Sequence, residues 1–223
     1  MNTKALLDQL LASGQAMLGH QPHSGGVAGA KPVGISDFGK GALAGGALGL
    51  LLGHKGVRKL GGSALKYGSV AALGALAYRA YTDYQRQNGQ TASAPPQTAD
   101  RVSPAEVERH SDAVLRALVA AAKADGHIDT RERGLIEAEL AKLVDDAETR
   151  RWFAAELAKP LDPAEVASAA TTPELAAEMY LASLLVVDQQ SFMERAYLDE
   201  LARQMQLPPA LKETLERQSL PAA

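Results

Sequence analysis

Signals that begin helices follow one another closely in the second half of the chain, and they constrain its fold more than any other feature. Residues Ser103–Glu106 read Ser-Pro-Ala-Glu, which places an N-cap, a proline at the first helical position and a capping-box glutamate in one run. Residues Asp162–Glu165 repeat this order with aspartate as the cap, while Thr172-Pro173 and Pro208-Pro209 mark two further starts. These signals predict a succession of short helices from residue 103 onward.

Apolar side chains between these signals recur at helical spacing, and no segment alternates as a strand would. The periodic positions are Val107, Val114, Leu115, Leu118, Ala122, Leu135, Ile136, Leu140 and Leu143. Bulk for a core comes from Trp152, Phe153, Tyr180, Leu184, Leu185, Phe192, Tyr197 and Leu201. We therefore predict an all-α fold, with a bundle of about seven helices over residues 103–223, a length sufficient for a hydrophobic core.

Charge divides the chain into two unlike halves. Residues 1–90 carry nine Lys/Arg against three Asp/Glu, a balance of +6, whereas residues 91–223 have a balance of −9. Nucleic-acid binding is not expected of the acidic half, because phosphate contacts need clustered lysine and arginine. The absence of cysteine excludes disulfides, thiol chemistry and cysteine-ligated zinc.

A stripe of glycines at every fourth position marks the basic half. The stripe consists of Gly41, Gly45, Gly49 and Gly53. In water these glycines weaken a helix, whereas in lipid they let a second helix approach closely. A second apolar stretch runs from Leu65 to Tyr81, after a basic break at residues 54–59. We predict a glycine-zipper hairpin associated with a membrane, although the first run of thirteen residues is shorter than the roughly 20 that span a bilayer. The alternative is a glycine-rich soluble or disordered segment.

The chain accordingly divides into four expected regions. Residues 1–36 form a short amphipathic helix, without the pattern of a cleavable signal peptide, and a Gly/Pro-rich linker. Residues 37–84 form the membrane-associated helices, and residues 85–102 form a polar linker that contains Pro95-Pro96. Residues 103–223 form the helical domain.

An acidic turn lies between two of the periodic segments. Residues 125–132 read Asp-Gly-His-Ile-Asp-Thr-Arg-Glu and resemble the second half of an EF-hand loop. Ala121 and Lys123, however, occupy the first and third ligand positions, which require oxygen donors. Residues 186–194 echo the pattern, with Asp188 in a turn and Ser191 three residues before Glu194. Two such turns, brought together by packing, would form a candidate site.

The same residues have a simpler structural explanation. Asp129 and Ser191 are expected N-caps, and Glu132 and Glu194 are expected to be their capping-box partners. Capping does not account for an acid at the matched positions Asp125 and Asp188, so a functional hypothesis depends chiefly on that pair.

The motif Ala122–Ile128, followed by Glu132, resembles TerB-like domains, which are named for a tellurite-resistance protein. With the glycine-rich region in front, the chain resembles the YebE-like family of bacterial inner-membrane proteins. The resemblance implies a helical bundle whose acids bind a divalent cation, an inner-membrane location and no known enzymatic activity. The residues predicted to hold the metal are Asp125, Asp129, Glu132, Asp188 and Glu194. This chain departs from the pattern at Gln189-Gln190, where the second turn lacks a glycine.

We therefore expect a membrane-tethered, non-enzymatic interaction or sensing module, related to envelope or metal stress. Its expected partners are membrane lipids and either another protein or a second copy bound through the glycine stripe. An oxygen-rich site would suit calcium, magnesium or manganese. The alternatives are a metal-dependent hydrolase that uses the same acids, and a soluble scaffold with a disordered glycine-rich tail.

Overall fold

The computed structural model describes residues 2–19, 69–89, 95–126, 128, 130–187 and 191–219, and these form nine helices and no strand. The helices are α1 (Thr3–Gly19), α4 (Val70–Gln87), α5 (Pro104–Ala122), α6 (Thr130–Leu143), α7 (Ala147–Ala158), α8 (Pro163–Ala167), α9 (Pro173–Val186), α10 (Phe192–Gln204) and α11 (Pro209–Ser219). The all-α prediction is confirmed for the described residues, and seven of the nine helices lie after residue 103, as expected.

Local capping explains where several helices begin. The Ser103 hydroxyl accepts the Glu106 backbone N–H, and the Glu106 carboxylate accepts the Ser103 N–H, which completes the predicted capping box of α5. Asp162 and Thr172 cap α8 and α9 as predicted. The predicted capping box at α10 is wrong, because the Ser191 side chain makes no cap hydrogen bond.

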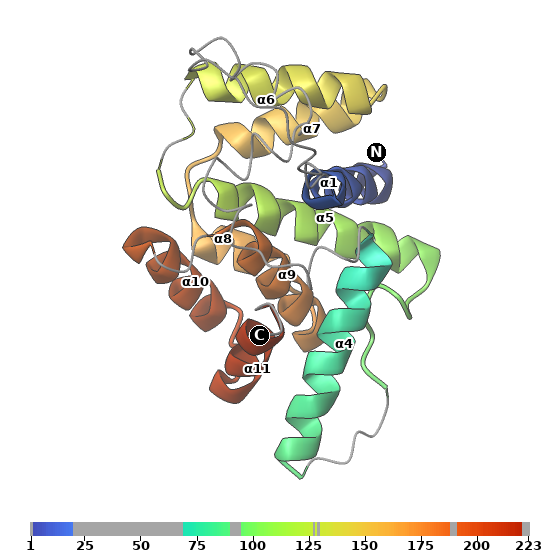
Figure 1. Ribbon diagram of the computed structural model, residues 1–223, viewed down its shortest axis with the longest axis vertical. Coiled ribbons are helices and arrows are strands. Elements are labelled where there is room, and N and C mark those ends of the chain that lie inside the picture. Colours follow the sequence, from blue (N-terminus) through green and yellow to red (C-terminus); the bar gives the residue numbers. More distant parts are fainter. Residues whose placement is uncertain are drawn as a thin grey trace, which may run out of the picture.

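Helix α9 forms the centre of the bundle. Every residue from Leu175 to Val186 is buried, and all of these except Glu178 and Ser183 are apolar or aromatic, as expected of a central helix. Its neighbours are α5, α4, α11 and α10. Helix α5 runs through the middle of the molecule, with the α6–α7 hairpin on one side and α10 and α11 on the other (Figure 1).

Both described helices of the basic half belong to this bundle. Helix α1 packs on α5 and buries Leu6, Leu7, Leu10 and Leu11. Helix α4 packs on α9 and α11 and buries Val70, Leu73, Gly74, Ala77 and Ala80, which share one helical face. The described part of the apolar stretch Leu65–Tyr81 therefore covers the protein core. Within the described ranges, no helix combines the length and the apolar character needed to cross a membrane.

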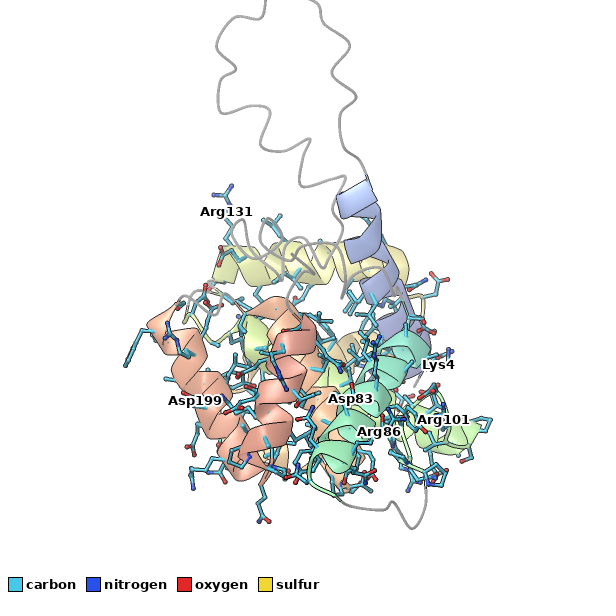
Figure 2. The ribbon with its side chains drawn as sticks, turned by 60° about the horizontal axis from the view of Figure 1, so that its bottom comes forward. Lys4, Asp83, Arg86, Arg101, Arg131 and Asp199 are labelled. Atoms are coloured by element: carbon cyan, nitrogen blue, oxygen red, sulfur yellow. The ribbon has the colours of Figure 1, made fainter. Side chains whose placement is uncertain are left out.

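In the segment between α4 and α5, residues from 95 onward are described, and several of them pack against neighbouring helices. Thr98 and Ala99 are buried, and the Ala99 N–H donates to the Glu178 carboxylate at 2.5 Å. The Arg101 guanidinium lies 3.9 Å from the ring centre of Tyr78, a cation–π contact with α4. Figure 2 shows Arg101 beside the helix that carries Asp83 and Arg86. The segment thus joins α4 to the central helix.

Candidate functional site

The first acidic turn begins where α5 ends. Lys123 and Ala124 continue the last turn of the helix through N–H bonds to Ala120 O and Ala121 O. Gly126 follows with a φ of +78°, a left-handed conformation that strains side-chain-bearing residues. Its N–H donates to Lys123 O at 2.9 Å. The glycine of the motif is therefore explained by backbone geometry.

The lysine of the motif connects two helices. Lys123 Nζ donates to Glu156 O and Lys159 O, both at 3.0 Å, at the C-terminal end of α7. Backbone carbonyls at the C-terminal end of a helix have no hydrogen-bond donor within the helix itself. Burial lowers the pKa of Lys123, while the carboxylates of Glu156 and Glu165 oppose this shift. Lys123 thus has a structural role as a cap of α7.

Ion pairs surround this lysine and join α5, α7 and α8. Glu156 accepts from Arg116 at 2.7 Å and from Lys159 at 2.6 Å. Lys159 also pairs with Glu165 of α8 at 2.8 Å. The same residues line a small cavity of about 20 Å³, which has room for about one water molecule. This arrangement holds α5, α7 and α8 together around the small cavity.

The start of α10 lies beside the first acidic turn. A Cβ atom on Gly126 would lie 3.9 Å from Cε of Met193, in the first turn of α10. Helices α5 and α10 are also in contact. The packing therefore brings together the neighbourhoods of Asp125 and Glu194, which are 69 residues apart in the chain.

The predicted metal ligands are only partly described. Asp125 and Glu132 are exposed, and Glu194 is half-buried. Asp129 and Asp188 lie outside the described residues, as do Gly41, Gly45, Gly49 and Gly53 of the stripe. Within the described part of the chain, no three His, Asp or Glu side chains are grouped to hold a metal ion. Figure 2 shows Arg131, in the first turn of α6, pointing away from the bundle.

Two large apolar side chains are exposed at the start of α10. The exposed fraction is 82% for Phe192 and 57% for Met193. The expectation that Phe192 contributes to the core is therefore wrong. The exposure of Phe192 follows from helical spacing. Tyr197 and Leu201 define the buried face of α10, and the residues one turn before Tyr197 on that face are Met193 and Glu194, not Phe192. This spacing was the signal by which the sequence could have identified Phe192 as exposed.

Similarity to known proteins identifies a family. The family model described as "Protein of unknown function (DUF533)" matches residues 37–219, which is more than half of the chain. No curated protein and no solved structure matches the chain. The match covers α4 through α11, including both turns and the apolar start of α10. The chain therefore belongs to the DUF533 family.

Proposed function

We propose that this protein is a membrane-tethered, non-enzymatic interaction module whose helical bundle docks a partner protein through Phe192 and Met193. These two residues are named the apolar tip. Single exposed apolar side chains are common on protein surfaces. Here an aromatic ring and a methionine are adjacent and both exposed by more than half, and these residue types are enriched at the centres of protein interfaces. This exposure is the observation that carries the proposal.

The position of the apolar tip indicates the chemistry of its partner. Phe192 is almost fully exposed, so it can enter a pocket on another protein rather than line one of its own. Met193 reaches back to Gly126, and a flexible thioether adapts well to an irregular contact. The matching partner is a protein surface with an apolar pocket for an aromatic side chain.

The membrane tether is proposed from the glycine-rich region. Support comes from the stripe of Gly41, Gly45, Gly49 and Gly53 and from the basic balance of residues 1–90. In this proposal the region holds the bundle at the inner membrane of a bacterium, in contact with lipids, and associates with a second copy. Fractionation of cells that express the full chain tests the tether, and recovery of all the protein in the soluble fraction would exclude it.

Binding of a divalent cation at the two acidic turns is a prediction that comes from the resemblance to TerB-like domains. Titration calorimetry of the full chain with calcium, magnesium and manganese tests it separately. The docking proposal does not depend on the result, because the apolar tip contains no metal ligand.

Crosslinking followed by affinity measurement tests the docking role. A photoreactive benzoylphenylalanine at position 192 of the full chain should capture one discrete protein in cells, whereas the same group at exposed Glu213 of α11 should not. The captured protein is then purified, and its affinity is measured for the original chain and for the Phe192→Ser/Met193→Ser variant. We expect it to bind the variant at least about tenfold more weakly, because burying one large apolar side chain contributes about 1.5–3 kcal/mol.

The variant also provides its own control. Both side chains are exposed, so its free energy of unfolding should change by no more than about 0.5 kcal/mol. Equal binding of both chains would refute the docking role. A different outcome would assign the apolar tip to a membrane surface: the original chain binds phospholipid vesicles, the variant does not, and no protein partner is captured.

A further inference from the structure

A second surface feature lies away from the apolar tip, on the hairpin of α6 and α7. A shallow groove of about 340 Å³ runs between these helices, within the range of ligand-binding sites. Its walls and floor are formed by Glu137, Leu140, Ala141, Ala147, Arg150, Arg151 and Ala154. Three of the seven are alanines, so an approaching chain can come close to both helix backbones.

Arg150 is the distinctive group of this groove. Its side chain is half-buried, and its Nε atom is buried without a hydrogen-bond acceptor in the described part of the chain. A buried donor that lacks an acceptor costs free energy, more so when the group is charged. An incoming acceptor can reach this donor only if the Arg150 side chain turns toward the groove, and the new bond then removes the existing penalty.

The neighbours of Arg150 determine the sign and character of the ligand. Arg151 also lines the groove, and its Nε donates to Ala147 O of its own helix at 3.2 Å. Glu137 is the single acid among the lining residues, so the balance of formal charge is positive. The remaining lining residues, Leu140 and the three alanines, are apolar.

We propose that the α6–α7 groove binds a peptide segment of another protein that carries an aspartate or glutamate beside apolar side chains. The carboxylate matches the planar fork of a guanidinium, with which it forms two parallel hydrogen bonds. The apolar neighbours of the acid would cover Ala141, Ala147 and Ala154, since Leu140 is already buried beneath them. A free inorganic anion would satisfy the arginine and leave this apolar surface exposed to water.

Peptide display with a matched counter-target tests the proposal. A random dodecapeptide library is selected on the immobilised full chain, and enriched sequences are measured on Arg150→Gln by fluorescence anisotropy. We expect enriched peptides with an acid between apolar residues, and a loss of affinity of about tenfold to a hundredfold on Arg150→Gln. Arg86→Gln removes the same charge from an exposed site on α4 and should bind these peptides as the original chain does.

The outcomes separate this groove from the apolar tip. The Phe192→Ser/Met193→Ser variant should bind the enriched peptides as tightly as the original chain does. Loss of the docking role at the apolar tip would therefore not affect peptide binding in the groove, and loss of peptide binding would not affect the docking role. Circular dichroism of Arg150→Gln should match that of the original chain. Enrichment of sequences without acids, equal affinity for folded Arg150→Gln, or a response to inorganic phosphate alone would overturn the proposal.

Discussion

The carboxylate of Glu178 in α9 lies 2.6 Å from Nδ1 of His110 in α5, and both side chains are buried. The other oxygen of this carboxylate accepts the backbone N–H of Ala99 at 2.5 Å. One side chain in the central helix therefore binds two segments that lie 68 and 79 residues earlier in the chain. An acidic side chain at this depth is tolerated because both of its oxygens have partners.

Removing the Glu178 carboxylate should be among the most destabilising single substitutions. Glu178→Ala leaves a buried histidine and a buried backbone N–H without their acceptor, which should cost about 3–5 kcal/mol of unfolding free energy. Urea unfolding measures this loss. Glu213→Ala, at an exposed site on α11, should change the free energy by no more than about 0.5 kcal/mol. A similar effect of the two substitutions would contradict the role assigned to Glu178.

The two substitutions Gly74→Ala and Gly134→Ala should change stability in opposite directions. A Cβ on Gly74 would lie 2.9 Å from Asp100 N and 3.0 Å from Ala99 N, both backbone atoms. Overpacking of this kind costs about 1–3 kcal/mol, which exceeds the gain of up to about 1 kcal/mol in helix propensity. A Cβ on Gly134, at an exposed position of α6, meets no described atom within 4 Å and should stabilise the fold by about 0.4–1 kcal/mol.

Thermal unfolding of both glycine variants checks this prediction. The midpoint should fall for Gly74→Ala and rise for Gly134→Ala, relative to the original chain. A rise for both would mean that the segment around Ala99 moves away from α4 without cost.

Two buried tyrosines should respond differently to loss of the hydroxyl group. The Tyr180 hydroxyl bonds to Glu216 at 2.8 Å, so Tyr180→Phe should cost about 1 kcal/mol at neutral pH. The Tyr197 hydroxyl is buried beside Ser183, whose own hydroxyl donates to Met179 O, and it forms no hydrogen bond of acceptable geometry among the described residues. Tyr197→Phe should therefore be neutral or stabilising at the same pH. The reverse ranking in urea unfolding would contradict the structure.

The same tyrosines should make the fold sensitive to alkali. Burial raises the pKa of both Tyr180 and Tyr197, and the hydrogen bond with Glu216 raises that of Tyr180 further. The unfolded chain releases these protons near pH 10, whereas the folded chain retains them, so their contribution is lost as the pH rises above about 10. Unfolding measurements between neutral pH and alkaline pH should show a smaller loss for each phenylalanine variant than for the original chain.

Lys123→Met should weaken the junction of α5 and α7. Methionine keeps most of the apolar stem but cannot donate to Glu156 O and Lys159 O, so the loss should be about 1–3 kcal/mol. Burial lowers the pKa of this lysine, so the unfolded chain holds its proton more tightly than the folded chain. The stability of the original chain relative to Lys123→Met should therefore rise with pH as the folded-state lysine deprotonates.

An exposed cation provides the control for this experiment. Arg86→Met on α4 removes a side chain that pairs with Asp83 only at the surface, and it should change the free energy by less than about 0.5 kcal/mol. Urea unfolding at several pH values measures both variants. A pH-independent difference between Lys123→Met and the original chain would contradict the buried position of the lysine.

The sequence by itself determined the fold class and most helix starts, because caps act between residues three positions apart. Ser103, Asp162 and Thr172 each cap the helix that their neighbours predict. Helix α7 begins after Asp146, a cap that no proline accompanies, so the local pattern that marks the other starts is missing there.

Only the tertiary structure decided which side chains are buried and what they contact. Met193 shares a helical face with the buried Tyr197 and Leu201, yet 57% of it is exposed, which the spacing alone does not predict. The partners of Glu178 and the close approach of Asp100 to Gly74 join residues far apart in the chain. Such contacts depend on how helices pack against one another, and no local pattern records that packing.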